Sequence, residues 1–365
     1  MKKMVSSCMC CITVVLLFGP SVYSRNILFN DSKTSVLEAY EMRINGNAEK
    51  AESLLSELVK NDSTDAVACF ELARTKQHLF LGGKQIPWEE VVKLSHQAVR
   101  YNPENEVYAF YFAYCSFFNA FVSMMQQAPD VAEKITLACD AFGNVLKLDP
   151  DCHEARLYLI DIYGQLPVEM GGNKEKAMAC VTEMNNRNML FGAMAGARLL
   201  PDTANHIFYW QKVGKEAGMN AQVLEEIGRA YLLNSDADNG TKYFLEAIQA
   251  DNSRRYLYMH LARYHLMMSQ EDPGNKEMHL EKSMLMVNNY LQSVPALIPP
   301  QKAYANGFMA LIRMLAGDDK GRNEYQESAS AIDPFYSRAT GMPSEMLYCR
   351  PDEVKIQYES FFNPF

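Results

Sequence analysis

The protein is a chain of 365 residues and 41.4 kDa, in which 48% of residues are hydrophobic and 22% are charged. That hydrophobic fraction is ample for a folded core, so the composition excludes a wholly disordered chain. Lys and Arg number 35 against 44 Asp and Glu, which gives a net charge of −9. The acidic balance argues against binding to nucleic acid or to anionic lipid, because both need basic surfaces.

The first 24 residues have the pattern of a secretory signal peptide. Lys2 and Lys3 precede an uncharged apolar run of twelve residues, Cys8 to Gly19, and small or aliphatic residues follow as far as Ser24. Such a run spans about 18 Å of helix against a bilayer core of about 30 Å, so a membrane anchor is the weaker interpretation. The pattern predicts export with cleavage after Ser24 and no stable membrane span in the mature chain. Loss of the two lysines takes the net charge from −9 to −11.

Six cysteines remain beyond the leader: Cys69, Cys115, Cys139, Cys152, Cys180 and Cys349. No two of them have the C-x-x-C spacing of a zinc or redox site. Most lie among apolar residues, so we expect small buried thiols. Export would permit one disulfide, for which Cys139 with Cys115 or with Cys152 is the pair to expect.

Helical stretches separated by polar turns recur along the chain. Apolar residues with a 3.6-residue period end at Asn102–Asn105, at Asp149–Asp151 and at Asp333–Pro334, often with proline just beyond the helix. Few segments alternate with period two. The pattern predicts an all-α protein.

One stretch shows the repeating unit clearly. Leu224, Ile227, Gly228 and Tyr231 share one helix face, and Phe244 and Ala247 follow on the next helix. We expect Gly228 to let two helix backbones approach closely, and the aromatic pair Tyr231 and Phe244 to fill the space where the helices diverge. This arrangement resembles the tetratricopeptide repeat, a helix–turn–helix of about 34 residues.

About seven such units follow one another from residue 35 to residue 334. The others are marked by Gly46, Ala51 and Asp62; by Leu72, Ala98 and Pro103; by Phe112, Ala138 and Pro150; by Leu159, Gly172 and Ala177; by Leu261 and His265; and by Gly317, Ala329 and Pro334. Inserts fall near Phe80–Trp88 and Met124–Asp130, and the region 185–220 fits the pattern poorly. The resemblance implies a right-handed superhelical solenoid after a linker at 25–34. A plain helical bundle is the alternative. The stretch from Leu166 to Ala177 is similar to exported bacterial tetratricopeptide proteins, including those associated with solute transporters.

Residues 335–365 differ from the repeats, because they carry several prolines and aromatic residues. We expect an extended segment with one short helix near Asp352–Phe361 that folds back as a cap on the last repeat, since a solenoid end otherwise exposes an apolar face. Its anchors would be Tyr348, Phe361 and Phe362, packed around Ala310, Met314 and Ala329. The alternative is a tail that docks on a partner.

The sequence offers no catalytic motif. The H-E-x-x-H, G-x-S-x-G and P-loop patterns are all missing, and Gly82-Gly83-Lys84 lacks the Ser or Thr of a phosphate loop. The seven histidines show no metal-ligand spacing. We therefore expect no enzyme activity, no cofactor and no metal.

The resemblance implies that the first helix of each unit lines the concave face, where ligands bind. The residues it places there are Phe70, Arg74, Gln77, Phe110, Tyr114, Phe117, Asp161, Glu225, Arg229, Tyr256 and Arg263. Aromatic area with fixed polar groups suits a protein or peptide partner, so the first hypothesis is a scaffold. The alternative is a transporter-associated protein that carries a small amphiphilic ligand beneath the inserts and the Leu166–Lys176 loop.

Overall fold

The computed structural model describes residues 34–201, 203–336, 345–356 and 358, and the elements in these ranges are all helical. The predicted all-α helical-repeat solenoid is confirmed. The predicted signal peptide lies outside the described residues. In chain order the helices are α2 (Thr34–Ile44), α3 (Ala48–Asn61), α4 (Ala66–Leu81), α5 (Trp88–Tyr101), α6 (Glu106–Met125), α7 (Val131–Leu148), α8 (His153–Gln165), η1 (Val168–Met170), α9 (Lys174–Arg187), α10 (Met189–Ala197), α11 (His206–Ala217), α12 (Ala221–Leu233), α13 (Ala237–Ala250), η2 (Asn252–Tyr256), α14 (Leu257–Glu271), η3 (Pro273–Asn275), α15 (Lys276–Leu291), α16 (Pro299–Leu315), α17 (Asp319–Ile332) and α18 (Glu345–Tyr348).

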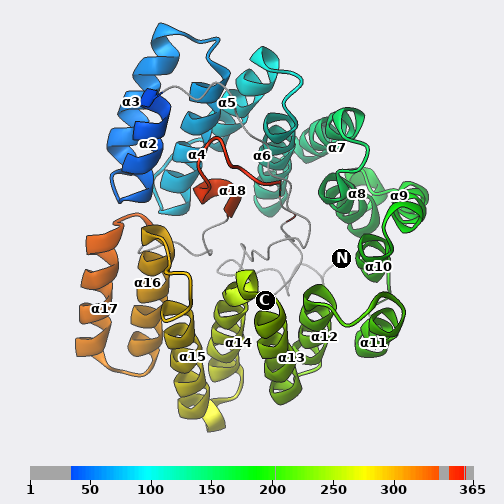
Figure 1. Ribbon diagram of the computed structural model, residues 1–365, viewed down its shortest axis with the longest axis vertical. Helices are drawn as coiled ribbons and strands as arrows, with labels where there is room; N and C mark the ends of the chain where they lie inside the picture. The colour runs from blue at the N-terminus through cyan, green and yellow to red at the C-terminus, as the bar shows by residue number, and fades with distance from the viewer. Residues whose placement is uncertain (1–33, 202, 337–344, 357, 359–365) are drawn as a thin grey trace.

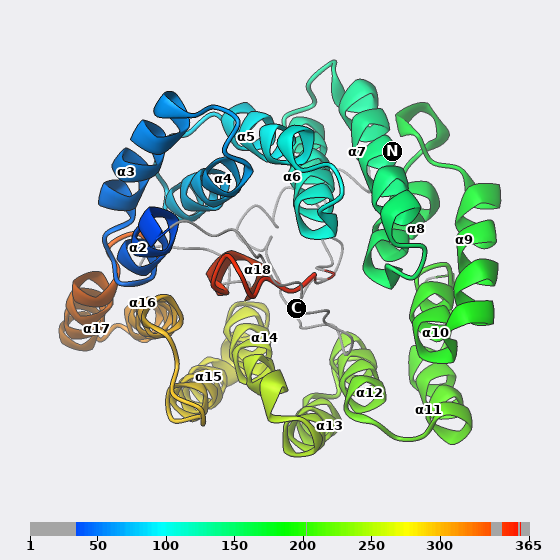
Figure 2. The same cartoon turned by 45° about the horizontal axis from the view of Figure 1, so that its top comes forward.

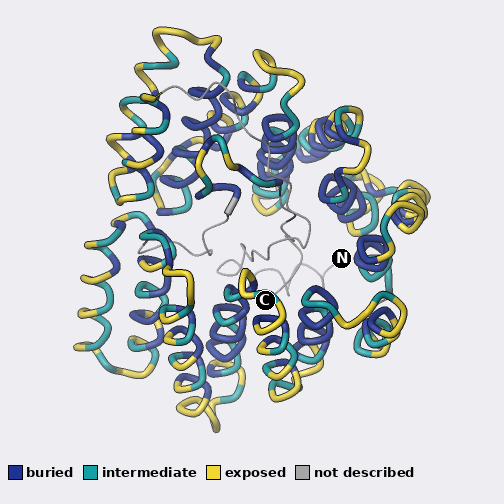
Figure 3. The backbone as a smooth tube through the Cα atoms, in the orientation of Figure 1, coloured by how far each residue is buried: buried dark blue, intermediate teal, exposed yellow. Residues whose placement is uncertain are grey.

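Consecutive helices pack in pairs, from α2 with α3 to α16 with α17, and short turns join the partners. Figures 1 and 2 show the pairs arranged around a common centre, with the even-numbered helices inside and the odd-numbered helices outside. Burial follows the same division, because exposed residues concentrate on the outer helices (Figure 3). Residues 185–220, which fit the repeat pattern poorly, supply the end of α9 and the helices α10 and α11, and α10 packs more extensively on α9 than on α11.

The closest approach within a pair occurs where the sequence predicts it. A Cβ atom on Gly228 of α12 would lie 2.3 Å from the ring of Phe244 and 3.2 Å from the carbonyl oxygen of Gly240, both on α13. Phe244 is fully buried there, and Tyr231 stacks on Tyr243 at 5.5 Å. The glycine therefore sets the distance between the two helices, as expected.

The inserts of the second and third units supply the ends of α4 and α6 and the turns that follow them. Helices α6 and α7 have 20 and 18 residues, and only the short turn from Gln126 to Asp130 joins them. Among the described residues, α6 alone has the length and apolar composition of a membrane span, and most of it is buried inside the protein. It is a core helix. The 3-10 turn η1, in the loop expected to cover a ligand, contacts the outer helix α7.

The six cysteines of the described chain form no disulfide. Cys115 lies on α6, Cys139 on α7 and Cys152 at the start of α8, and the bridge considered for Cys139 is not made. Cys69, Cys115 and Cys152 are buried, as expected of small apolar side chains.

The array closes on itself, so that its last residues contact its first pairs. Gly46 follows α2 with a φ of +79°, and a Cβ atom there would lie 2.6 Å from the carbonyl oxygen of Ile332 at the end of α17. A Cβ atom on Gly82 would lie 2.4 Å from the Cβ of Phe335. The His78 Nε2 atom lies 3.3 Å from Asp333 Oδ2, and both side chains are fully buried. The last pair thus lies beside the first (Figures 1 and 2).

Candidate functional site

The C-terminal segment, residues 345–358, lies inside the ring against the N-terminal half of its inner face. Figures 1 and 2 both place α18 between α4 and the centre of the ring. The expectation that Tyr348 packs on the last repeat is wrong, because its ring contacts His78 of α4 and its carbonyl accepts a bond from Tyr40 of α2. Met314, one of the expected contacts, is 46% exposed. Phe361 and Phe362 lie outside the described residues.

After α18 the segment makes a turn, in which the Glu353 amide donates to the carbonyl of Arg350 at 2.9 Å, and it is extended from Val354. The expected helix near Asp352–Phe361 does not form in the described part of that range, and the helix lies instead at Glu345–Tyr348. Val354, Ile356 and Tyr358 are buried at every second position, which is the spacing of an extended chain. This alternation is visible in the sequence and indicates an extended chain, and the prediction of a helix here overlooked it.

Side chains from α2 and α4 bind the main chain of this segment. Tyr40 donates its hydroxyl to the carbonyl of Tyr348 at 2.8 Å, and Arg43 Nη1 donates to the carbonyl of Leu347 at 2.8 Å. Arg74 Nη2 donates to the next carbonyl, that of Cys349. Three successive carbonyls are therefore held by one buried set of donors.

The two arginines share one carboxylate. Glu71 accepts from Arg43 at 2.6 Å and from Arg74 at 2.7 Å, and all three side chains are fully buried. Burial and the neighbouring Arg43 lower the pKa of Arg74, whereas Glu71 outweighs burial and raises the pKa of Arg43. Two guanidinium groups facing one carboxylate keep unused donors, and the peptide carbonyls accept from them.

Tyr348 is the first side-chain anchor of the segment. Its hydroxyl lies 3.2 Å from His78 Nδ1, and its ring packs at 5.3 Å from Tyr336 and below the Arg43 guanidinium. Burial lowers the pKa of His78 against the opposing effect of Asp333, and burial also raises the pKa of Tyr348 well above its usual value. The same histidine thus contacts both the segment and the closure of the ring.

Tyr358 is the second side-chain anchor of the segment, and it contacts Asp161, which was predicted to lie on the concave face. Its hydroxyl donates to the Asp161 carboxylate, which also lies 3.2 Å from Arg198 Nε at the end of α10. The Arg198 guanidinium lies over the Tyr358 ring at 4.6 Å, and the Tyr158 ring lies at 4.9 Å. Burial raises the pKa of Asp161, although Arg198 and the tyrosine hydroxyl favour its charged form.

The predicted aromatic contacts are packing residues of the same half. Phe70 lies 4.8 Å from Tyr108, Phe110 lies 6.0 Å from Phe142, and Phe117 lies 5.6 Å from Tyr158. Gln77 joins two tyrosines of α6: it accepts from the hydroxyl of Tyr111 at 2.7 Å and lies 3.4 Å from the hydroxyl of Tyr114. These side chains are almost fully buried, so they support the donors and leave little of their own surface for a ligand.

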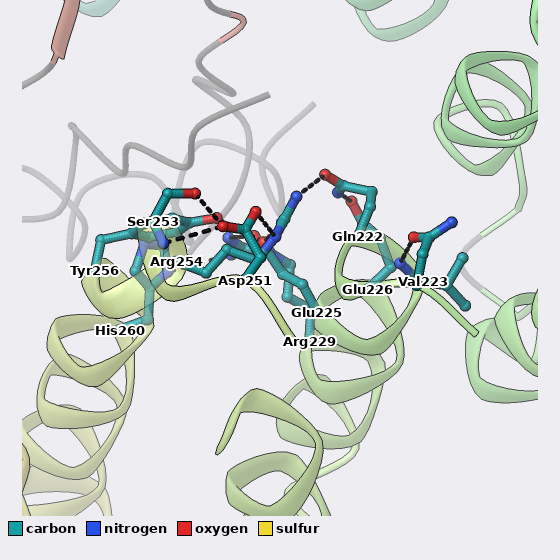
Figure 4. A network of polar contacts seen from close by, with 11 residues as sticks. Gln222, Val223, Glu225, Glu226, Arg229, Asp251, Ser253, Arg254, Tyr256 and His260 are labelled. Carbon is teal, nitrogen blue, oxygen red and sulfur yellow. Dashed lines mark hydrogen bonds and ion pairs between the residues drawn. The ribbon is translucent and has the colours of Figure 1, made fainter. Parts of the chain in front are cut away.

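A second polar network joins α12, η2 and α14 on the other half of the ring (Figure 4). Glu225 accepts from Arg229 at 2.6 Å, from Tyr256 at 2.6 Å and from Arg254. Burial opposes ionisation of Glu225, but Arg229 and Arg254 prevail, so its pKa is lowered. Three predicted residues, Glu225, Arg229 and Tyr256, are thus brought together.

The prediction missed four members of this network: Gln222, Glu226, Arg254 and His260. Gln222 accepts from Arg254 at 3.2 Å and donates to Glu226 at 2.9 Å. Burial raises the pKa of Glu226. Substituting Glu for Arg229 would place two carboxylates together in a buried site. Arg263 stands apart, half-buried beside Tyr304 of α16.

The two sites are built differently. The first binds main-chain carbonyls and phenol groups of the C-terminal segment, whereas the second gathers arginines and a tyrosine around the carboxylate of Glu225. In the ranges that the structure describes, no three His, Cys, Asp or Glu side chains are grouped so that they could hold a metal ion.

No family model and no curated protein matches the chain. Similar solved structures include a tetratricopeptide repeat protein from Parabacteroides merdae, at 13% identity over 76% of this chain and 97% of that one, with a TM-score of 0.41. Another is MamA, at 14% identity over 59% of this chain and 95% of that one, with a TM-score of 0.29. The C-terminal part of a repeat protein from Cytophaga hutchinsonii covers 82% of this chain and 95% of its own at 14% identity, with a TM-score of 0.28. The stacked helix pairs of the chain and the glycine–aromatic contact between α12 and α13 define an all-α helical-repeat fold that resembles the tetratricopeptide repeat.

Proposed function

We propose that this protein is an exported, non-catalytic scaffold that holds a segment of another polypeptide against the inner face of its helix ring. The observation that supports the proposal is the binding of three successive main-chain carbonyls by Tyr40, Arg43 and Arg74. Main-chain recognition of this kind suits a polypeptide ligand, because every peptide presents the same carbonyls whatever its side chains.

The charged groups nearby are arranged for binding. Glu71 pairs with Arg43 and Arg74, and Glu225 pairs with Arg229 and Arg254, which lower the pKa of Glu225. A general base needs a free proton-accepting position and a pKa near the working pH. A scaffold role fits these paired groups better than acid–base catalysis does.

Export is the other part of the proposal, and it rests on the signal-peptide pattern of residues 1–24. The intact mass of protein purified from its native cell measures this directly. We expect a mature chain that begins at Arg25 and is recovered outside the cytoplasm. A native chain that retains Met1 would contradict export by cleavage.

The binding function is tested with a displayed random peptide library on the purified mature chain. Enriched peptides are resynthesised with a photo-crosslinking group, and the crosslinked residues are mapped by mass spectrometry. We expect crosslinks on the inner helices α2, α4, α6 and α8. The matched control is a scrambled version of each peptide. Failure to enrich any sequence, or crosslinks confined to outer helices such as α5 and α7, would contradict the proposal.

A further inference from the structure

We propose that the C-terminal segment, residues 345–358, is a built-in ligand that leaves and rebinds the inner face, and that the partner replacing it is a polypeptide segment with tyrosines in the places of Tyr348 and Tyr358. This inference rests on the proposed function and names the chemistry of the segment that the ring binds.

The surface beneath the segment combines apolar and polar groups. Leu347, Val354 and Ile356 pack into the hydrophobic core. The segment also covers buried polar side chains and bonds to most of them directly: Arg43, Glu71, Arg74, His78 and Asp161. Burying the ion pairs among them costs desolvation, which offsets part of the apolar contribution. Water can hydrate these groups again when a segment leaves, so such a surface suits reversible binding.

The ring closes without the segment. Its last residues reach the first pairs through the close approaches of Gly46 to Ile332 and Gly82 to Phe335, and through the contact of His78 with Asp333. The segment is therefore not needed as a cap on an exposed end. Its hydrogen bonds run to α2, α4, α8 and the end of α10, up to 308 residues away in the sequence. The segment lies on the ring as a separate peptide would.

The contacts of the segment also define which side chains a replacement peptide needs. Any sequence can supply the carbonyls at residues 347–349, whereas only tyrosines supply the two phenol groups. Tyr348 fits between His78, Tyr336 and Arg43, and Tyr358 bonds to Asp161 beneath Arg198. An aromatic ring without the hydroxyl would leave the buried Asp161 with one donor fewer. The preferred partner is thus a segment with two tyrosines about as far apart as these.

Exchange of the segment can be measured on the full mature chain with a protease site placed within residues 337–344. After cleavage, a fluorescein-labelled peptide of residues 345–358 (EMLYCRPDEVKIQY) is added and its anisotropy followed. We expect saturable binding that unlabelled peptide competes away. The Tyr358→Phe peptide should bind at least about tenfold more weakly, because it lacks a hydrogen bond to a carboxylate. The Glu353→Gln peptide is the control, since Glu353 is exposed, and its affinity should be unchanged.

Amide hydrogen exchange on the uncut chain gives a second measurement in case the cleaved protein does not stay folded. We expect the amides of residues 345–356 to exchange together and faster than those of α14. Exchange of these amides only with global unfolding, or no binding of the labelled peptide to a folded cleaved chain, would overturn the inference. The proposed function would survive that result if library peptides still crosslink to the inner helices. Exchange of the segment without capture of any library peptide would instead count against the proposed function.

Discussion

At the scale of the residue, the inner face is characterised by buried arginines. Arg43, Arg74 and Arg254 are among the largest fully buried side chains of the described chain. Each is paired with a carboxylate, as a buried charge requires: Arg43 and Arg74 with Glu71, and Arg254 with Glu225. These pairs explain why residue types that suit contact with a ligand are instead bound to one another inside the protein.

Replacing Glu225 with Gln tests the second network. The change leaves Arg229 and Arg254 buried without their shared carboxylate, and breaking a buried pair in this way costs about 3–5 kcal/mol. Urea denaturation of the mature chain measures the free energy of unfolding. Glu216→Gln is the control, because Glu216 is about half exposed and pairs only with Lys212 at 3.9 Å. Equal stabilities of the two variants would show that the network contributes little.

Because His265 is buried, we expect the protein to lose stability in acid. Burial, with smaller contributions from Lys282 and His279, lowers the pKa of His265 from 6.5 to about 4. The folded chain then binds fewer protons than the unfolded chain between these values, so the free energy of unfolding falls as the pH drops from 6.5 towards 4. At pH 4.5 this one group should cost about 2–3 kcal/mol relative to pH 7.

Denaturation of His265→Phe across this pH range measures the contribution of the group, and the variant should show a shallower decline than the natural chain. His96→Gln, at an exposed position on α5, serves as the control and should keep the full slope. An unchanged slope in His265→Phe would assign the acid sensitivity to other groups.

At the scale of the element, the helix pair is the unit, and its geometry depends on a few small residues. Gly228 lets α12 approach α13, and Gly240 faces it across the same contact. Helices α10 and α11 form where the sequence fits the repeat pattern poorly, and α10 packs mainly against α9. The run MLFGAMAGA of α10 is apolar almost throughout and has no polar face, because most of the helix is buried. A helix buried on all sides lacks the periodicity by which the other helices were found.

Substituting Ala for Gly228 should destabilise the protein, although Ala favours helices. The new methyl group would lie 2.3 Å from the ring of the fully buried Phe244, and overpacking of this kind costs about 1–3 kcal/mol. Gly143→Ala on α7 is the matched control, because its Cβ meets nothing within 4 Å. That variant should gain about 0.5–1 kcal/mol from helix propensity. Thermal denaturation compares the two, and a gain at both positions would refute the close approach.

At the scale of the whole molecule, the repeats close into a ring, and this closure changes the role of the C-terminal segment. An open solenoid needs a cap at each end, whereas here the first and last pairs contact each other near Gly46 and Gly82. The segment is thereby available to occupy the inner face.

Closure of the ring is tested by Gly46→Ala with Gly83→Ala as its control. Both glycines have positive φ, of +79° and +90°, so both substitutions carry the same backbone strain of about 1–2 kcal/mol. Only at position 46 does the methyl group meet the carbonyl oxygen of Ile332, at 2.6 Å, while nothing lies within 4 Å at position 83. Gly46→Ala should therefore lose more stability and show a larger radius of gyration in small-angle X-ray scattering. Equal values for both variants would argue against a closed ring in solution.

The sequence alone determined the class of fold and the packing within a pair. Helical periodicity and the polar turns are local properties, and so is the spacing of Gly228, Tyr231 and Phe244, which is why these predictions are confirmed. Arg74 and Asp161, which were predicted as ligand contacts, bond to the C-terminal segment of the same chain, and their contact with a partner stays a prediction.

Only the tertiary structure showed that the C-terminal segment of the same chain lies against the inner face. The bonds that hold the C-terminal segment join residues 160 to 308 positions apart, and no local pattern encodes them. Whether an array of helix pairs stays open or closes depends on the sum of small rotations between neighbouring pairs, which packing along the whole chain sets. Closure of the ring places Asp333 beside His78, and the C-terminal segment that follows Asp333 in the chain accepts bonds from the buried donors of α2 and α4.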